Sequence, residues 1–229
     1  MTGCTLAVRD VAAGYARREV FREVSFQVPE GQSLGVLGPS GAGKTTLLRV
    51  ISGLLKPCAG DVRIGGLAPR DAVRRCPIAY FAGEATLPGS VRAGRWGEVG
   101  TAGLVISERR RIRTLSRGTR QLLGLRTVLG RHPLSVIVLD EPWEALDQDG
   151  ARWLTATLET KRDRGAAVVL SSHRMHDLAG LCDAYLFLIA GRAQLVKAHD
   201  ITRVGPVTGA LLTDLFDRLR GASSLRAVP

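Results

Sequence analysis

The chain has 229 residues, and its 32 lysines and arginines outnumber its 21 aspartates and glutamates, which gives a formal net charge of +11. This length suits one large domain and leaves little room for a second independent catalytic domain. The longest stretch without a charged residue, Gly31 to Gly43, is well short of the roughly 20 apolar residues that span a bilayer. Met1 to Asp10 lacks the basic and apolar regions of a secretion signal, so we expect a cytoplasmic protein.

Most of the net positive charge lies in one central segment. Between Glu84 and Arg131 there are ten arginines against three glutamates. Such a surplus suits nucleic acid, anionic lipid or a polyphosphate ligand. The four cysteines form no CxxC pair and have no histidine at metal-ligand spacing, so we expect reduced thiols and no zinc site.

Apolar patterns in the first third of the chain predict a strand, a loop and a helix in that order. Val20 to Val28 alternates as a strand does, and Ser33 to Leu37 is an apolar run of the kind that forms a buried parallel strand. A glycine-rich turn follows. Lys44 to Leu54 then carries apolar residues at helical spacing, and Ile78 to Phe81 is the next predicted strand.

Strands and helices continue to alternate after residue 115. We predict helices at 120–129, 150–164, 175–181 and 208–220, and strands at 136–139, 167–170 and 184–189. This alternation favours a mostly parallel sheet with helices on both faces. Glu84 to Thr114 is the exception, because no strong period survives there, and we expect a small inserted subdomain at about residues 84–116.

Residues 38–45 match the phosphate-binding pattern G-x-x-x-x-G-K-[ST], after a predicted strand and at the start of a predicted helix. Glycines let successive N–H groups converge on phosphate oxygens, and the helix N-terminus adds partial positive charge. Lys44 would reach the outer phosphates, Thr45 would hold Mg²⁺, and Thr46 would donate toward the α-phosphate. The alternative is a chance glycine turn. The expected nucleoside-triphosphate site consists of Gly38, Pro39, Ser40, Gly41, Ala42, Gly43, Lys44, Thr45 and Thr46.

Two adjacent carboxylates, Asp140 and Glu141, follow the apolar run Val136 to Leu139. Ligands of parallel sheets bind at the carboxyl ends of the strands, and neighbouring side chains of a strand point to opposite sides. Asp140 would therefore complete the Mg²⁺ shell with Thr45, while Glu141 would polarise the attacking water as general base. The alternative is a strand that ends in a solvated acidic turn.

The stretch Leu115 to Gln121, LSRGTRQ, resembles the LSGGQ signature of the ATP-binding cassette (ABC) ATPases, and it lies upstream of the acid pair as in that family. An ordinary helix cap by Ser116 is the alternative for this stretch alone. Tyr15 resembles the aromatic residue that stacks on adenine in that family. Ala145-Leu146-Asp147 resembles the D-loop, and His173 resembles the switch histidine.

The resemblance implies a P-loop NTPase core with a mostly parallel sheet and N-terminal antiparallel strands, formed by residues 1–229 as one domain. Two such domains would pack head to tail, so that Ser116, Arg117 and Gly118 of one contact the ATP held by the other, with Asp147 nearby. His173 would hold the γ-phosphate and the lytic water. The implied cofactors are ATP and Mg²⁺. The implied partners are a second copy and a separate transmembrane permease, which would place the chain at the inner face of the cell membrane.

The chain departs from the family pattern after the predicted strand at 78–81. The family usually places a glutamine there, whereas this chain has Ala82-Gly83-Glu84. We expect the carboxylate of Glu84 to serve as a Mg²⁺ ligand instead, because a hard cation accepts carboxylate oxygen as readily as amide oxygen. The added negative charge would slow basal hydrolysis. A soluble or regulatory ABC ATPase with weak turnover is therefore the alternative function.

The leading interpretation is an ATP-hydrolysing subunit that energises a separate permease. ABC ATPases that act on DNA or ribosomes usually carry a long coiled-coil insert, zinc-binding cysteines or two fused cassettes. The sequence shows none of these, so we expect no nucleic-acid partner. The central arginines Arg109, Arg110, Arg111 and Arg113 would then lie toward the permease or anionic lipid, and a solvated basic loop is the alternative.

Overall fold

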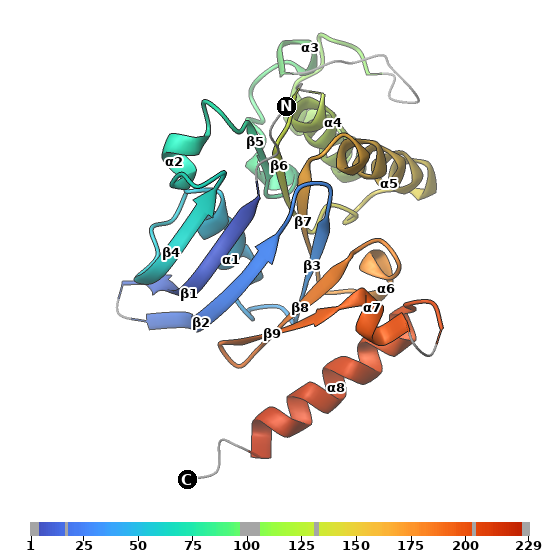
Figure 1. The fold of residues 1–229 in the computed structure, drawn as a ribbon. Helices are drawn as coiled ribbons and strands as arrows, with labels where there is room; N and C mark the ends of the chain where they lie inside the picture. The colour runs from blue at the N-terminus through green and yellow to red at the C-terminus, as the bar shows by residue number, and fades with distance from the viewer. Residues whose placement is uncertain (1–4, 17, 97–105, 131–132, 203–204, 226–229) are drawn as a thin grey trace.

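A computed structural model describes residues 5–16, 18–96, 106–130, 133–202 and 205–225, the side chains of 223–225 excepted. Within these residues a three-stranded antiparallel sheet stands beside a six-stranded, mostly parallel sheet, and helices pack around both (Figure 1). The expected α/β fold with antiparallel strands near its N-terminus is confirmed.

The smaller sheet has the strand order β2-β1-β4. Its strands are β1 (Leu6–Tyr15), β2 (Arg18–Val28) and β4 (Ala59–Ile64). Along β2, Val24, Phe26 and Val28 are buried, while the residues between them are exposed. This alternation buries one face of the sheet and leaves the other in solvent, as is usual for antiparallel sheets.

The larger sheet has the strand order β5-β6-β7-β3-β8-β9, in which β9 alone is antiparallel to its neighbour. Its strands are β3 (Ser33–Leu37), β5 (Ile78–Phe81), β6 (Val136–Asp140), β7 (Ala167–Ser172), β8 (Ala184–Ile189) and β9 (Arg192–Lys197). The glycine-rich loop after β3 and the acid pair after β6 therefore meet at one edge of the sheet, where parallel strands bind ligands.

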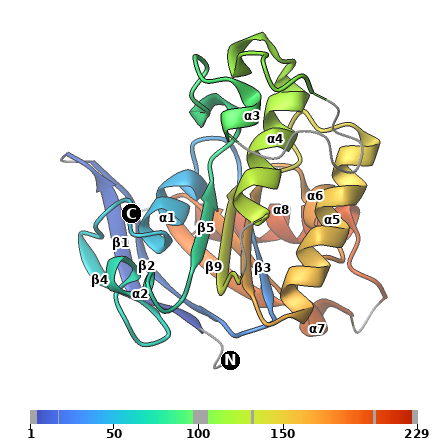
Figure 2. The same ribbon diagram turned by 90° about the horizontal axis from the view of Figure 1, so that it is seen from above.

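Helix α1 (Lys44–Ile51) lies between the two sheets (Figure 2). Its Leu47 and Ile51 are fully buried, in the same apolar cluster as Phe21 of β2 and Val138 of β6. Each such side chain contributes about 1.5–3 kcal/mol by leaving water. The packing on both sides fixes α1, and with it the loop that precedes it.

The other face of the larger sheet is covered by helices. These are α4 (Arg117–Leu129), α5 (Gln148–Asp163), α6 (Met175–Leu178) and α8 (Gly209–Leu225). Along β6, Val136 and Val138 face the α1 cluster, whereas Ile137 and Leu139 belong to the cluster under these helices. A strand buried on both faces explains why its sequence is a continuous apolar run.

The segment between β5 and α4 has a small apolar cluster of its own. Its elements are η1 (Glu84–Thr86), α3 (Ala93–Trp96) and η2 (Ile112–Thr114), of which η1 and η2 are 3₁₀ turns. Ala93, Ile106, Ile112 and Leu115 pack together with Leu123 of α4. The described part of the expected insert is thus short and irregular, and residues 97–105 of the insert lie outside the described residues.

Several predicted boundaries differ from the structure for local reasons. The helix predicted over 44–54 ends at Ile51, because Gly53 turns left-handed at φ 72° and the N–H of Leu54 donates to the carbonyl of Arg49. The helix predicted over 175–181 ends at Leu178. The terminal helix predicted over 208–220 continues to residue 225.

The sequence patterns gave no bounds for β1 and no prediction for β4, β9, α2 (Pro69–Ala72) and α7 (Ala198–Ile201). Strand β9 has no buried residue, and even its Leu195 is exposed, so it lacks the buried apolar run that marks the other strands of this sheet. Helices α2 and α7 have only four residues each, which is about one turn and too short for a helical period to show.

Cys58 and Cys182 carry free thiols, whereas Cys76 is disulfide-bonded. The expectation of four reduced thiols is therefore wrong for Cys76. Burial raises the pKa of the Cys182 thiol, which keeps it protonated and unreactive. Within the described ranges, no group of three or more His, Cys, Asp and Glu residues is arranged to hold a metal ion.

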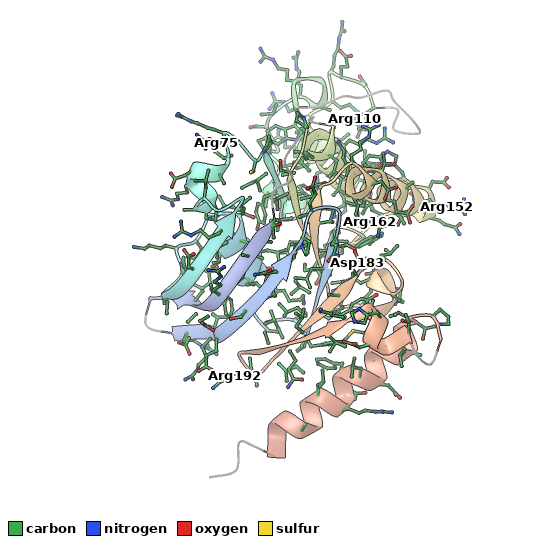
Figure 3. The ribbon with its side chains drawn as sticks, viewed as in Figure 1. Arg75, Arg110, Arg152, Arg162, Asp183 and Arg192 are labelled. Carbon is green, nitrogen blue, oxygen red and sulfur yellow. The ribbon has the colours of Figure 1, made fainter. Side chains whose placement is uncertain are left out.

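The outside of the molecule is basic on several sides. Arg75, Arg110, Arg152 and Arg192 project from different elements and in different directions (Figure 3). In the part of the chain that the structure covers, none of the helices is both long enough and apolar enough to cross a bilayer.

Candidate functional site

The loop between β3 and α1 wraps around the ammonium group of Lys44. This side chain is 7% exposed, and its Nζ donates to the carbonyls of Gly38 at 2.8 Å and Pro39 at 3.3 Å. Gly43 precedes α1 at φ 101°, and a Cβ there would lie 2.6 Å from Cγ1 of Val20, so the turn requires glycine. The first N–H groups of α1 and the buried ammonium together form a site for an anion.

Thr45 and Asp140 meet where this loop faces the end of β6. The Thr45 hydroxyl donates to Oδ2 of Asp140 at 2.5 Å, and the Ser171 hydroxyl donates to Oδ1 at 2.5 Å. Asp140 and Ser171 are register partners on the parallel strands β6 and β7. The carboxylate is thus oriented by two hydroxyls. A hydroxyl and a carboxylate oxygen in contact are hard donors of the kind Mg²⁺ takes, so these residues fit the expected ion.

Glu141 leaves β6 in the left-handed region, at φ 47°. Its N–H donates to the hydroxyl of Ser171 at 3.0 Å. Its Oε1 lies 3.3 Å from Nζ of Lys44, and its Oε2 lies 2.9 Å from Nδ1 of His173 and accepts from the His173 N–H at 3.2 Å. The expected base is therefore in contact with both Lys44 of the phosphate loop and His173, the expected switch histidine.

Ser116 caps α4 and starts it three residues earlier than the sequence predicts. The N–H of Thr119 donates to Oγ of Ser116 at 3.1 Å. Two residues on, a Cβ at Gly118 would lie 2.4 Å from the carbonyl oxygen of Ala145, so α4 approaches the loop after β6 closely. Among the described residues, no hydrogen bond or ion pair joins Ser116 or Gly118 to residues 38–46.

Two further side chains organise the loop that carries the acid pair. Gln121 is 2% exposed, and its Nε2 donates to the carbonyls of Glu141 at 3.3 Å and Pro142 at 3.0 Å. Asp147 accepts from the N–H of Gly150 at 2.8 Å and so caps α5. The loop from β6 to α5 is therefore held at both ends.

Glu84 follows β5 and accepts from two arginines of α4. Nε of Arg117 lies 3.1 Å from Oε1, and Nε of Arg120 lies 2.9 Å from Oε2. Arg117 also donates through Nη2 to Oε1 of Glu144 at 2.5 Å, and this hydrogen bond raises the pKa of Arg117. The structure thus brings Glu84 to the signature residues. Its expected place among the Mg²⁺ ligands stays a prediction.

Tyr15 ends β1 beside the phosphate-loop helix. Its ring is 45% exposed, and its hydroxyl accepts from Nη1 of Arg49 at 3.1 Å. Hydrogen bonding to Thr46, and then to Arg49, lowers the pKa of Tyr15. The ring is therefore next to α1, where it is accessible for stacking on a base.

A cavity of about 160 Å³ opens beside the acid pair. It is lined by Ala82, Gly83, Glu84, Ala85, Arg117, Gln121, Asp140, Glu141 and Glu144. The loop after β5, the signature turn and the acid pair thus share one space. The fold thus brings residues that are far apart in the sequence to one cavity.

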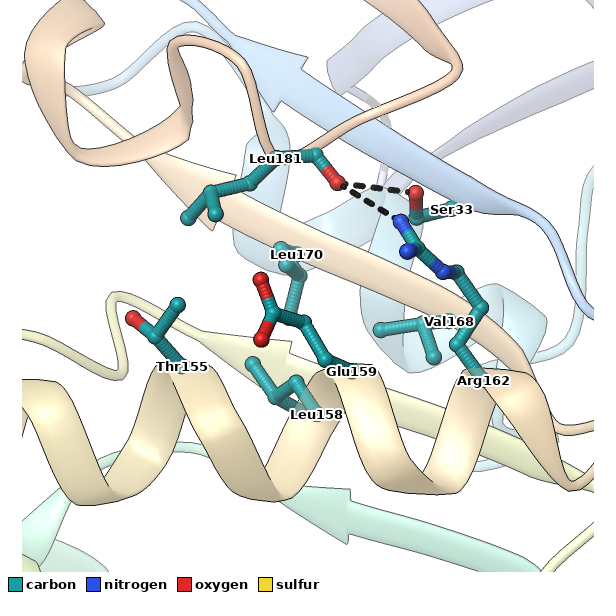
Figure 4. A pocket seen from close by; sticks show the side chains of 8 residues that line it. All are labelled: Ser33, Thr155, Leu158, Glu159, Arg162, Val168, Leu170 and Leu181. Carbon is teal, nitrogen blue, oxygen red and sulfur yellow. Dashed lines mark hydrogen bonds between the residues drawn. The ribbon is translucent and has the colours of Figure 1, made fainter.

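A smaller cavity of about 20 Å³ lies between α5 and the sheet (Figure 4). Leu158, Val168 and Leu170 make it largely apolar, and Ser33 and Arg162 both donate to the carbonyl of Leu181, at 3.0 and 3.5 Å. The volume admits about one water molecule. Ser33 begins β3, so this cavity lies at the opposite end of that strand from the phosphate loop and is not the nucleotide site.

A family model described as ABC transporter matches residues 21–144, more than half of the chain. The chain belongs to the ABC transporter family. The uncharacterized ABC transporter ATP-binding protein YhcH of Bacillus subtilis strain 168 is 33% identical over 219 residues, 86% of this chain and 72% of the relative. This ABC ATPase is an ATP-binding subunit whose hydrolysis of ATP energises transport, and such subunits work with permease partners.

Two solved structures share the fold. The structure of an ATP-binding subunit of an ABC transporter has a TM-score of 0.78 and 23% identity, over 92% of this chain and 98% of the other. The dimeric post-hydrolysis state of the cassette MJ0796, bound to ADP and Pi, has a TM-score of 0.70 and 20% identity, over 84% and 98%. The ABC cassette fold expected from the motifs is confirmed.

The structure also shows residues that sequence reasoning missed. Ser171 binds both members of the acid pair, yet in the sequence it is only the end of an apolar run. Its position at the carboxyl end of a strand next to β6 was the available signal. The contact of Glu144 with Arg117 and the contact of Arg49 with Tyr15 have no signal in the sequence, because only the folded chain brings these residues together.

Proposed function

We propose that two copies of this chain pack head to tail and bind two ATP molecules between them, at the inner face of the cell membrane. Each ATP lies between residues 38–46 of one copy and the signature turn Ser116–Gly118 of the other, with Asp147 beside it. The pair energises a separate transmembrane permease. Residues 1–229 act as one nucleotide-binding domain, with about 84–116 as an inserted subdomain.

One observation carries this proposal. Lys44, Thr45, Asp140, Glu141 and His173 converge on one contact cluster. The signature turn, by contrast, makes no described hydrogen bond to the phosphate loop of its own chain. A second copy related by twofold symmetry supplies the missing half of each site. The fold shared with a dimeric cassette supports this arrangement.

The nucleotide contacts follow from the positions of these residues. The glycine-rich loop and the first N–H groups of α1 bind the phosphates, and the Lys44 ammonium exchanges its loop carbonyls for phosphate oxygens. Tyr15 stacks on the adenine. Thr45 and Asp140 hold Mg²⁺, which when bound neutralises charge on the outer phosphates. Glu84 joins that shell only if it releases Arg117 or Arg120.

Glu141 acts as the general base of hydrolysis. Its carboxylate takes the proton of a water whose oxygen bonds to the γ-phosphorus, while the bond from that phosphorus to the bridging oxygen breaks, giving ADP and inorganic phosphate. His173, 2.9 Å from Oε2, orients the carboxylate, and Lys44 stabilises the charge that moves to the leaving oxygen. These roles follow from contacts that already exist in the folded chain.

The Glu141→Gln variant tests this proposal. The amide keeps the shape of the carboxylate but accepts no proton, so ATP remains uncleaved and holds two chains together. We expect analytical ultracentrifugation with ATP and Mg²⁺ to show a dimer that disperses when ATP is removed. The exposed-residue control Glu159→Gln should behave as the parent chain. A Glu141→Gln chain that binds ATP and stays monomeric would falsify the head-to-tail dimer.

A further inference from the structure

Four charged residues form one ionic network across three segments of the cassette. Glu84, after β5, binds Arg117 and Arg120 in the first turn of α4. Arg117 in turn binds Glu144 in the loop after β6. The network therefore joins the loop after β5, the signature turn and the loop that follows the acid pair.

Glu84 is the most buried member of this network. Its side chain is 14% exposed, against 26% for Arg120, 46% for Glu144 and 59% for Arg117. Exposed ion pairs contribute little because water and salt screen them, so the Arg117–Glu144 pair is the weaker link. The Glu84–Arg120 pair is less screened, and neutralising Glu84 would leave the partly buried charge of Arg120 without this partner.

Both carboxylate oxygens of Glu84 are already engaged, one with each guanidinium. A Mg²⁺ ion would compete with two fixed cations for these oxygens. The preceding residue, Gly83, stands at φ 86° and ψ 167°, a conformation essentially restricted to glycine, and it directs the chain into η1. The backbone of the loop after β5 thus places Glu84 in contact with α4.

We propose that Glu84 is a positioning residue that fixes the signature turn to the loop after β5 through Arg117 and Arg120. This inference rests on the head-to-tail dimer proposed above, in which that turn meets the nucleotide of the other copy. Gln121, one turn after Arg117 on the same face of α4, joins that helix to the acid-pair loop, and Glu84 joins it to the loop after β5. Loss of the Glu84 contacts or of the Gln121 contacts leaves Ser116 and Gly118 wrongly placed for the second copy.

The test compares Glu84→Gln with Arg120→Gln in full-length Glu141→Gln chains. Each variant should weaken the ATP-dependent dimer roughly tenfold, and the double variant should be no weaker than Glu84→Gln, because the ion pair lost in Arg120→Gln is one of the two already lost in Glu84→Gln. Binding of a fluorescent ATP analogue to dilute single chains should not change. The reversed pair, Glu84→Arg with Arg120→Glu, should recover part of the loss.

Asp61→Asn is the matched control, because Asp61 forms an exposed ion pair of the same geometry with Arg63 at 2.7 Å on β4. Titration with Mg²⁺ separates the two roles of Glu84. If Glu84 is a metal ligand, Glu84→Gln alone will shift the concentration of Mg²⁺ that the chain requires, and that result overturns the inference. A Glu84→Gln dimer of parent affinity overturns it as well. If the Glu141→Gln parent forms no dimer, the proposed function fails and the inference fails with it.

Discussion

At the residue scale, Ser171 shows how one small side chain can organise two functional groups. Its hydroxyl donates to Asp140 and accepts from the N–H of Glu141, at 2.5 and 3.0 Å, and the residue is fully buried. A buried polar group that loses its partner carries a desolvation penalty of about 1–3 kcal/mol. The left-handed conformation of Glu141 depends on the same hydroxyl, since nothing else described accepts from that N–H.

We therefore expect Ser171→Ala to lower the free energy of unfolding by about 1–3 kcal/mol and to reduce ATP turnover. Asp140 would keep only Thr45 as a partner, and Glu141 would lose the bond that holds its turn. Ser171→Thr keeps the hydroxyl and serves as the control. Denaturant unfolding and a phosphate-release assay measure the two effects. A Ser171→Ala chain with parent stability would show that the two groups find other partners.

The backbone at Gly83, after β5, does not accept the family's glutamine without strain. Its φ of 86° and ψ of 167° strain any side chain, although a Cβ there would meet no atom within 4 Å. Restoring the family residue by Gly83→Gln should therefore destabilise the chain by about 1–3 kcal/mol. Calorimetry should record a lower Tm. Gly221→Gln, at an open helical position without positive φ, should cause no comparable fall.

At the element scale, the strands that the sequence predicts best are those whose apolar run ends where the strand ends, whereas β6 and β7 continue past their apolar runs into Asp140 and Ser172. Strands β3, β5 and β8 have the predicted ends, because their apolar runs stop where the chain leaves the sheet. The exposed edge strand β9 gave no such signal. The candidate site, too, could be predicted only in part. Its motifs could be located from spacing, whereas the contacts of Ser171 and Glu84 depend on which strand and helix lie next to β6.

The start of helix α4 closely approaches the loop after β6, and a substitution at Gly118 tests whether this close approach is needed. A Cβ at Gly118 would lie 2.4 Å from the backbone oxygen of Ala145, which has no flexible end that could give way. Gly118→Ala should push the start of α4 outward and weaken the bonds of Gln121 to the acid-pair loop. Turnover should fall at least severalfold, while ATP binding by the phosphate loop is retained. Gly221→Ala is the control.

ATP binding and ATP turnover of the Gly118→Ala chain need measurement on the same preparations. A Gly118→Ala chain that hydrolyses ATP at the parent rate would show that the close approach is dispensable. Equal losses of ATP binding and turnover would mean that the substitution disturbs the whole nucleotide site and not only the signature turn.

At the scale of the whole molecule, the inserted segment presents several exposed arginines for which the described residues provide no ion-pair partner. Arg92 and Arg111 stand opposite each other in an antiparallel bridge, where like charges repel. Within the described residues, these two and also Arg109 and Arg113 are exposed and have no ion-pair partner. Arg110 differs, because its guanidinium donates to the carbonyl of Thr114. An external anionic surface would relieve this repulsion, as a permease partner could.

We expect simultaneous replacement of Arg92, Arg109, Arg111 and Arg113 by glutamine to weaken assembly with the permease and to leave ATP binding unchanged. Charges at the rim of an interface act mainly on the association rate and on its salt dependence. Association with the permease in lipid nanodiscs should therefore slow, roughly tenfold at low salt, and depend less on ionic strength. The matched control replaces four exposed arginines elsewhere, Arg9, Arg18, Arg74 and Arg75, and removes the same charge. Equal slowing by both sets would show that net charge, not the inserted segment, governs assembly.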